Sequence, residues 1–376
     1  MNIAILGMGK IGSGVYEGAK ARNDMNVVRT LDLKAWMDDM TTDIDDIAND
    51  PSIEAVVETM GGLHPAYEYA QKCISAGKSY VTANKYLVSV YGLELQEAAQ
   101  KNGVGFRFSA ACGGGIPYLE NLWDAGKSDR VLRVGGIMNG TTNYILDRMQ
   151  SEGMSYESAL SEAQALGYAE RDPSSDVDGL DTQRKIALAS AVAFGELLKC
   201  DTIPTFGIRS IQKEDIAYFQ KKKLSVRLVA EAQKHENGVS ASVQPVLVSA
   251  DSPENGIRRN INYLWYEGEK SGVFAFSGQG AGKYPTAANV IRDLLLLTTG
   301  EKSMMPENVK LAEASCLSER SYYVRAPLKE KDSLASLIRG METDGKWMYA
   351  ITIPVNEGEI HRLVCKMDGA FLAALI

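Results

Sequence analysis

Cysteine and histidine are scarce in this chain of 376 residues, and their spacing excludes several kinds of site. The five cysteines are scattered and form no CxxC pair, so the sequence predicts neither a disulfide framework nor a zinc site. The three histidines lie far apart and no HExxH motif is present, which argues against a histidine-based metal site. This usage is typical of a reducing compartment, and we expect a cytoplasmic protein.

Long apolar runs and basic clusters are also missing. No apolar run approaches the ~18 residues that a membrane helix requires, and the first predicted strand starts at Asn2, which leaves no room for a signal peptide. A net charge of −8, without a basic stretch interleaved with aromatic residues, argues against nucleic-acid binding. We therefore expect a small-molecule substrate as partner, and neither nucleic acid nor membrane.

The segments that are present predict an α/β protein with two or three domains. Strand-like and helix-like segments alternate with short loops over residues 1–128, which predicts a parallel sheet with helices on both faces. From Arg130 onward, amphipathic helices are followed by strand-like runs typical of an antiparallel sheet, so residues 129–318 predict a mixed α+β domain. The run AANVIRDLLLLTTG predicts a helix that packs back onto the first domain.

A GxGxxG motif follows the first predicted strand and opens a helix. Gly7 permits the tight turn, Gly9 lets the backbone approach a pyrophosphate, and Gly12 allows close packing of helix and strand. The helix N-terminus favours the anion. In this context the motif predicts a Rossmann-type dinucleotide-binding domain.

An acidic residue follows the second predicted strand, twenty residues after Gly12. Asp32 at this position accepts hydrogen bonds from the adenosine ribose and disfavours a 2′-phosphate, which favours NAD over NADP. Arg29 or Lys34 nearby can still meet a phosphate, so the preference stays open.

The most informative stretch is LGYAERDPSSDVDGLDTQRK at residues 166–185. Asp181 and Lys185 lie four residues apart in a predicted helix and therefore share a face. Pro173 and Gly179 interrupt regular structure before it, which places the preceding acidic residues on a loop. Such an arrangement suits a small substrate with an amine and a carbonyl group. The alternative is a solvated acidic loop before an ordinary helix.

This stretch resembles the signature of homoserine dehydrogenases, GYxExDPxxDxxGxDxxxK. Further segments agree in the same order: GMGKIG, ETMGGLHPA, VTANKYL, GIMNGTTNYIL and GQGAGKYPTA. The resemblance covers roughly residues 1–320. It implies NAD(P)-dependent interconversion of L-homoserine and L-aspartate 4-semialdehyde, in threonine and methionine synthesis, by a homodimer or homotetramer whose second domain supplies the substrate site and the dimer contact. The alternatives are a related dehydrogenase for another amino-acid aldehyde and a noncatalytic nucleotide-binding regulatory protein.

The resemblance also implies roles for individual residues. The alkoxide formed by hydride transfer requires a proton, and the resemblance makes Lys185 its donor, with Lys85 near the nicotinamide. The implied catalytic residues are Lys185, Lys85 and Asp181, and the implied substrate contacts are Glu170, Asp176, Asp181, Tyr168, Gly140 and Thr141. The implied cofactor contacts are Gly7, Gly9, Lys10, Ile11, Gly12, Asp32, Thr59, Lys85, Gly167 and Gly280.

The chain departs from the family pattern in two places. Ser109 stands where the family usually has a Glu that binds a monovalent cation together with backbone carbonyls. The carbonyls of Cys112 and Gly114 remain candidate ligands for that cation. The tail, residues 319–376, reads as strand, helix, strand, strand and short helix, which predicts either a degenerate ACT-like module without a last strand or an extension that caps the core.

Overall fold

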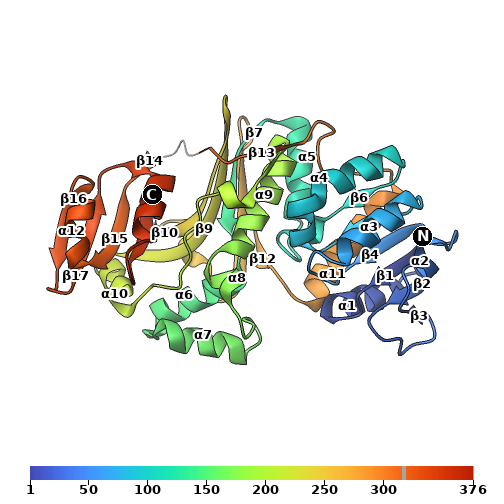
Figure 1. Cartoon of the computed structure of the whole chain (residues 1–376), viewed down its shortest axis with the longest axis horizontal. Coiled ribbons are helices and arrows are strands. Elements are labelled where there is room, and N and C mark those ends of the chain that lie inside the picture. The colour runs from blue at the N-terminus through green and yellow to red at the C-terminus, as the bar shows by residue number, and fades with distance from the viewer. Residues whose placement is uncertain (316–318, 376) are drawn as a thin grey trace.

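The computed structural model describes residues 1–315 and 319–375, and its N-terminal lobe is built on a parallel sheet (Figure 1). All neighbouring strands of this six-stranded sheet are parallel, which confirms the predicted Rossmann-type domain. The strand order reverses between β1 and β4, and ligands of such sheets bind at the carboxyl edge near that point. In spatial order the strands are β3 (Met40–Thr41), β2 (Asn26–Leu31), β1 (Asn2–Leu6), β4 (Ala55–Glu58), β5 (Ser79–Thr82) and β6 (Phe106–Arg107).

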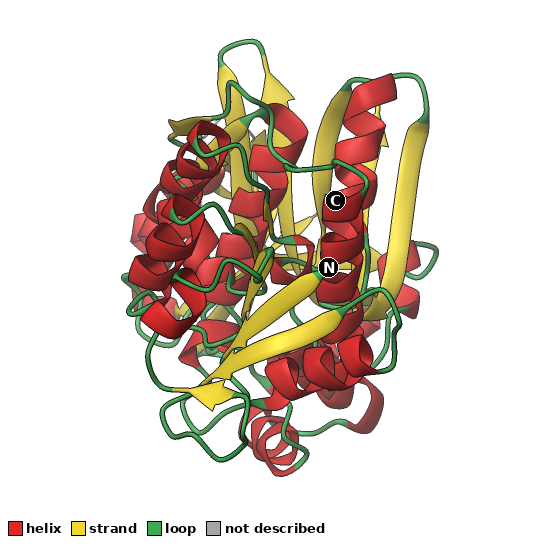
Figure 2. Cartoon of the chain, turned by 90° about the vertical axis from the view of Figure 1, so that its right-hand side faces the viewer, coloured by secondary structure: helices red, strands yellow, loops and turns green. Residues whose placement is uncertain are grey.

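Helices cover both faces of this sheet (Figure 2). The side chains of β1 alternate between two apolar clusters, since Ala4 and Leu6 join one and Ile3 and Ile5 join the other. The first cluster includes α3 (Ala66–Ser75) and α4 (Lys85–Lys101), which follow β4 and β5; the short α2 (Asp45–Ala48) precedes β4. The second includes α1 (Lys10–Lys20) and α11 (Lys283–Thr298). The predicted packing of α11 on the first lobe is therefore confirmed.

The second lobe is built on a nine-stranded mixed sheet, whose first five strands are antiparallel. They are, in spatial order, β12 (Gly272–Gln279), β11 (Ile261–Gly268), β7 (Val131–Ile137), β9 (Leu224–His235) and β10 (Gly238–Ser249). The helices of this lobe are α5 (Tyr118–Ser128), α6 (Gly140–Glu152), α7 (Tyr156–Ala165), α8 (Ser174–Val177), α9 (Leu180–Phe194) and α10 (Lys213–Lys221). The short strands β8 (Glu196–Leu198) and β13 (Lys310–Ala312) pair separately.

Helix α9 connects the two lobes. It begins after Gly179 and ends before Gly195, and both glycines adopt positive φ angles, of 85° and 68°, which side chains disfavour. It packs against the strands β7 and β9 of its own lobe and against α4 of the other lobe. This position brings the first turn of α9 to the boundary between the lobes.

The tail differs from its prediction at its last element. After the predicted short helix, α13 (Glu357–Val364), the run FLAAL forms a further strand, β19 (Phe371–Leu375), which was not predicted. An apolar run of this length fits a buried strand and a buried helix equally, so periodicity does not distinguish them. β19 pairs antiparallel with β15 and parallel with β10, which joins the tail to the sheet of the second lobe. The other tail elements are β14 (Glu319–Arg320), β15 (Tyr322–Pro327), α12 (Lys331–Leu334), β16 (Ile338–Thr343), β17 (Trp347–Thr352), β18 (Val355–Asn356) and α13 (Glu357–Val364).

The tail therefore holds a complete strand-helix-strand-strand-helix-strand unit, and the predicted lack of a last strand was wrong. Its strands continue the sheet in the order β19-β15-β17-β16, with a first helix, α12, of four residues. Within residues 1–315 and 319–375, no helix is long and apolar enough to cross a membrane.

Candidate active site

The glycine motif forms an open turn between β1 and α1. Gly7 has a φ of 87°, and a Cβ atom on Gly12 would lie 1.9 Å from the Gly7 carbonyl oxygen. A Cβ on Gly9 would meet nothing within 4 Å, so the turn is open on that side. Gly9 caps α1 without a side-chain hydrogen bond, and Lys10 and Ile11 begin the helix. The free N–H groups and the open side fit a pyrophosphate.

Asp32 lies beside this turn, at the carboxyl end of β2. One of its carboxylate oxygens accepts a hydrogen bond from the Met8 backbone N–H at 2.8 Å, and the other accepts one from Leu33 at 2.7 Å. The predicted ribose ligand is therefore next to the predicted pyrophosphate turn.

Thr59 and the turn after β4 brace the glycine motif from the next strand. The Thr59 hydroxyl contacts the Gly7 carbonyl oxygen at 2.7 Å, so it holds the turn directly. Glu58, which the sequence analysis missed, is buried and accepts hydrogen bonds from the N–H groups of Met60 and Gly61 and from the Thr82 hydroxyl. Burial raises the pKa of Glu58. The signal for Glu58 in the sequence is a single Glu at the end of an otherwise apolar strand.

The centre of the candidate site is the carboxylate of Asp181, in the first turn of α9. Its Oδ2 lies 2.6 Å from the Nζ of Lys185, one turn further along α9, as the spacing predicts. Its Oδ1 lies 2.9 Å from the Nζ of Lys85, the first residue of α4 in the other lobe. Burial by itself raises the pKa of Asp181, but the two ammonium groups outweigh it and hold this pKa below its usual range. The charge of Asp181 in turn raises the pKa of Lys85.

Asn139 extends this cluster, and the sequence analysis did not single it out. Its Nδ2 donates hydrogen bonds to Asp176 at 2.6 Å and to Asp181 at 2.9 Å. Its Oδ1 accepts one from the Thr142 N–H, which caps α6. An Asn directly before a helical run is a capping signal that the segment GIMNGTTNYIL contains. Burial and then the charge of Asp181 raise the pKa of Asp176.

The backbone completes the environment of Lys185. Its ammonium group donates a second hydrogen bond, at 2.6 Å, to the carbonyl oxygen of Met138, the residue before Asn139. Asn262 donates to the same oxygen. The lysine is therefore held between a carboxylate and a carbonyl at the end of β7.

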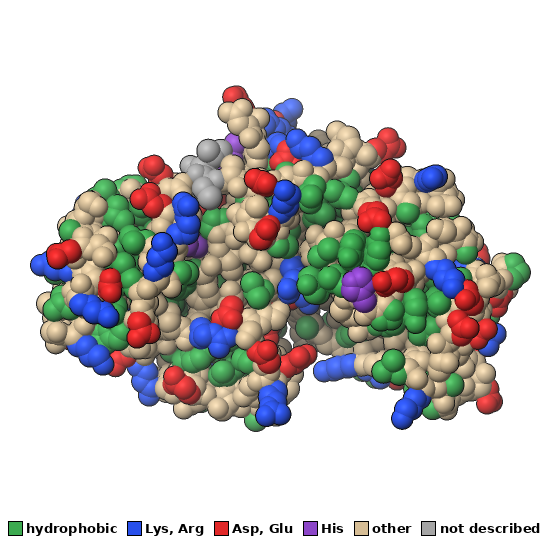
Figure 3. All heavy atoms as spheres, in the orientation of Figure 1, with side chains coloured by type: hydrophobic (Ala, Val, Ile, Leu, Met, Phe, Trp, Pro, Cys, Tyr) green, Lys and Arg blue, Asp and Glu red, His purple; other side chains and the backbone are tan. Residues whose placement is uncertain are grey.

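The other predicted substrate residues, and the predicted cofactor contact Gly167, lie at the start of α6 and on the loop between α7 and α8. Gly140 and Thr141 begin α6, and the Thr141 hydroxyl donates to the Tyr168 carbonyl at 2.7 Å. Tyr168 is 40% exposed. Glu170 and Gly167 lie exposed on the loop between α7 and α8, and no described hydrogen bond joins the Glu170 carboxylate to the cluster around Asp181. In Figure 3 the surface is hollowed between the α7–α8 region and the lobe that carries α1.

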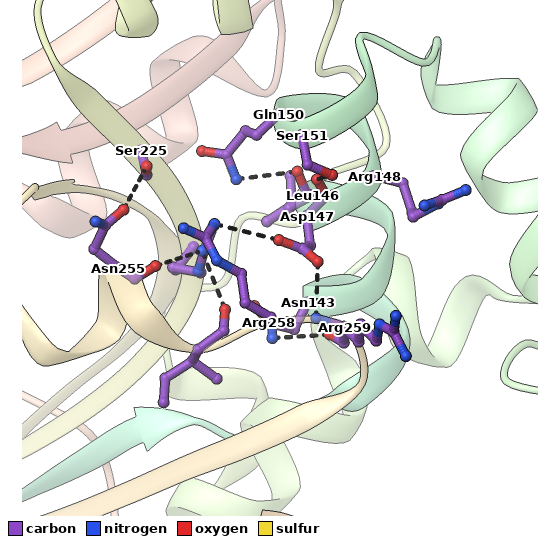
Figure 4. Close-up of polar contacts among 12 residues, drawn as sticks. Asn143, Leu146, Asp147, Arg148, Gln150, Ser151, Ser225, Asn255, Arg258 and Arg259 are labelled. Carbon is purple, nitrogen blue, oxygen red and sulfur yellow. Dashed lines mark hydrogen bonds and ion pairs between the residues drawn. The ribbon is translucent and has the colours of Figure 1, made fainter.

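Polar contacts on the far side of α6 fix its orientation (Figure 4). Asp147 accepts a hydrogen bond from the Arg259 backbone N–H at 2.9 Å, and Asn143 donates to the carbonyl oxygens of Arg259 and Ile261 at 2.9 and 3.1 Å. These contacts tie α6 to the segment before β11, so that its N-terminus faces Asp181.

The remaining predicted positions lie on two segments that join the lobes: Cys112 and Gly114 precede α5, and Gly280 lies between β12 and α11. Cys112 is buried, and burial raises the pKa of its thiol to about 12, while the charge of Lys185 opposes this rise. The loop before α5 therefore lies near the cluster around Asp181. A Cβ on Gly280 would lie 2.0 Å from the side-chain amide of Asn262, and one on Gly114 would lie 2.4 Å from the Gly280 carbonyl oxygen, so the two glycine segments pack backbone to backbone.

Known proteins share this architecture and sequence. The family model described as the NAD binding domain of homoserine dehydrogenase matches residues 7–109, and the one described as homoserine dehydrogenase matches residues 117–295. A homoserine dehydrogenase from Lactococcus lactis is 32% identical over 383 residues, covering 97% of this chain and 85% of that protein. One from Bacillus subtilis is 36% identical over 312 residues, covering 78% of this chain and 72% of that protein. The chain belongs to the homoserine dehydrogenase family.

Solved homoserine dehydrogenases have the same fold. The crystal structure from Thiobacillus denitrificans has a TM-score of 0.88 at 28% identity and covers 100% of this chain and 98% of that chain. A hyperthermophilic archaeal homoserine dehydrogenase in complex with NADPH has a TM-score of 0.69 at 25% identity, covering 82% of this chain and 99% of that chain. As a homoserine dehydrogenase, this chain is an NAD(P)-dependent oxidoreductase of amino-acid biosynthesis, and the noncatalytic alternative is not favoured.

Proposed function

We propose that Lys185 transfers the proton in the interconversion of L-homoserine and L-aspartate 4-semialdehyde. A bound nicotinamide cofactor supplies or accepts the hydride. In the direction of aldehyde reduction, the Lys185 ammonium group donates a proton to the oxygen of the forming alcohol; in the reverse direction, neutral Lys185 accepts it. Asp181 keeps the ammonium form of Lys185 oriented, because its carboxylate lies 2.6 Å from the Nζ.

The observation that carries this proposal is that lysines from both lobes share one buried carboxylate. Lys85 begins α4 at the carboxyl edge of the nucleotide-binding sheet, and Lys185 comes from the substrate lobe. A group held between them is within reach of both the cofactor site and the substrate site. Lys85 then orients the substrate beside the nicotinamide, which it does without exchanging a proton.

Acidic groups around this point bind the substrate ammonium group. Asp176 is oriented by Asn139, and an ammonium group in a closed site requires carboxylate partners. Glu170, on the exposed loop between α7 and α8, is the second carboxylate that we assign to the substrate ammonium group. Tyr168, Gly140 and Thr141 form the wall beside the ammonium group.

Gly9 and Asp32 would hold the adenosine half of the cofactor, with Asp32 as the partner of its ribose, and we propose a preference for NAD(H). A 2′-phosphate beside this carboxylate is repelled, and Arg29 lies within β2, away from the strand end where Asp32 stands.

We further propose a homodimer or homotetramer in the cytoplasm. Edge strand β12 exposes Val273 and Phe274, with 64% and 45% of their surfaces accessible, and an apolar sheet edge favours association. The described cysteines Cys73, Cys112, Cys200 and Cys365 are free thiols, which suits a reducing compartment; Cys316 lies outside the described residues. Light scattering measures the molecular mass in solution.

The test of the activity is a spectrophotometric assay of nicotinamide reduction with L-homoserine, with NAD and NADP in separate reactions. Homoserine-dependent reduction is expected, and L-serine and L-threonine serve as control substrates. If another amino alcohol gave a higher kcat/KM than homoserine, the related dehydrogenase would replace this proposal.

A further inference from the structure

The loop that joins the lobes meets α11 at the position where the family resemblance implies a monovalent cation. Such a site needs carbonyl oxygens that face an open point and a carboxylate that balances the charge. Ser109 supplies no carboxylate, so the other groups around this loop determine whether a cation fits there.

The side-chain amide of Asn289 fills the point that the carbonyls face. Its Nδ2 lies 2.6 Å from the carbonyl oxygen of Gly114 and 3.0 Å from that of Ile116, and Asn289 is 3% exposed. An N–H donor presents partial positive charge to a carbonyl oxygen, as a cation does. A small cation between these two oxygens would have to displace the amide nitrogen.

A carboxylate on the same face of α11, that of Asp293, already pairs with an internal cation, the Arg107 guanidinium. Asp293 lies one turn after Asn289 on α11, and its Oδ1 accepts hydrogen bonds from the Ser109 hydroxyl at 2.6 Å and from the Arg107 Nε at 3.0 Å. Its Oδ2 accepts one from the Ser109 N–H at 2.8 Å. The Arg107 guanidinium also pairs with Glu120, and Arg107 and Asp293 are fully buried.

We propose that the Asn289 amide and the Arg107 guanidinium take the place of the monovalent cation, so that neither the stability nor the turnover of this enzyme depends on sodium or potassium. Side chains on one face of α11 then hold the loop next to Cys112 in place. The nearby cluster around Asp181 therefore keeps its geometry in any monovalent salt. The statement on turnover rests on the proposed function, whereas the statement on stability does not.

The first experiment uses the full-length wild-type enzyme, exchanged into tetramethylammonium chloride and compared with sodium and potassium chloride at equal ionic strength. A cation that binds only the folded state raises the melting temperature. We expect melting temperatures within about 2 °C of one another and kcat/KM for homoserine within about threefold. A larger increase of the melting temperature or of kcat/KM in sodium or potassium chloride overturns the proposal. If no salt supports homoserine oxidation, the proposed function fails, while the melting comparison still decides this inference.

The second experiment tests the assignment to Asn289 with the isosteric variant Asn289→Asp. A carboxylate oxygen against the two carbonyl oxygens repels them unless a cation lies between, so we expect a lower melting temperature in tetramethylammonium that sodium or potassium partly restores. Asn102→Asp is the matched control, because exposed Asn102 donates to a single carbonyl, that of Ala98, and its response should be equal in all salts. If Asn289→Asp melts at the same temperature in all three salts, Asn289 does not stand in the place of the cation.

Discussion

Replacement of Lys185 by Met gives the sharpest test of the catalytic assignment. The methionine has a similar length and removes only the ammonium group, which donates to Asp181 and to the Met138 carbonyl at 2.6 Å each. Asp181 keeps Lys85 and Asn139 as partners, and the Met138 carbonyl keeps Asn262, so no buried acceptor is left unpaired. We therefore expect a stability loss of only about 1–3 kcal/mol.

The effect on turnover should be much larger than the effect on stability. A positioned general acid contributes about 10²–10⁴-fold to the rate, which corresponds to about 3–5 kcal/mol of transition-state stabilisation. We expect kcat for Lys185→Met to fall by this factor, while the KM for the cofactor changes by less than about threefold. Steady-state kinetics and urea denaturation measure the two effects separately.

Lys78→Met is the matched control. Lys78 is also a buried lysine, and its ammonium group donates to the carbonyl oxygens of Asp50 and Ile53, remote from the cluster around Asp181. This control should lose stability and keep kcat. If Lys185→Met kept more than about a tenth of the wild-type kcat, or if Lys78→Met lost as much, the proton-transfer role of Lys185 would be refuted.

Further predictions concern substrate, cofactor, pH and tail. Asp181→Asn and Glu170→Gln should each raise the KM for homoserine or lower kcat, since the substrate ammonium group loses a counter-charge; parental kinetics in both would show that the acidic stretch is only a solvated face. Asp32 should make kcat/KM with NAD at least as high as with NADP, and a large NADP preference would contradict this. Burial lowers the pKa of His361 to about 4 from 6.5, so the folded state favours the neutral imidazole. The free energy of unfolding should therefore be full above pH 6.5 and decline by up to about 3 kcal/mol between pH 6.5 and 4. Denaturation of His361→Gln across this pH range should lack that decline. Arg325→Met should lower the free energy of unfolding in urea by about 3–5 kcal/mol, because the buried Arg325 guanidinium lies 2.8 Å from the buried carboxylate of Asp215 in α10. A decrease of less than about 1 kcal/mol would argue against the tail as part of the core.

Threonine titration on the full chain tests the regulatory reading of the tail. We expect little inhibition, because the first helix of the tail, α12, is a single turn and the segment LKEKDSL that forms it contains no glycine. A truncation before β15 is expected to destabilise the protein, since it removes β19 from its pairing with β10. Strong inhibition of the full chain that vanished in a folded truncated chain would restore the regulatory reading.

Elements whose signals are local were predictable from the amino-acid sequence. The glycine turn, the alternation of strands and helices in the first lobe, and the face shared by Asp181 and Lys185 depend on backbone conformation and on helical spacing, which neighbouring residues set. The tail strand β19 escaped prediction, because a five-residue apolar run becomes a strand only when β10 and β15 supply its hydrogen-bond partners.

Which distant side chains meet depends on the packing of whole elements and was not predictable from the sequence. Lys85 reaches Asp181 because α4 and α9 pack across the boundary between the lobes, and no local pattern records that packing. The same holds for Asn289, whose amide lies between two carbonyl oxygens of a loop more than 170 residues earlier in the chain. Hydrogen bonds and ion pairs between residues far apart in the chain form only when whole helices and strands pack together. Local sequence patterns identify the partners but not which of them pair.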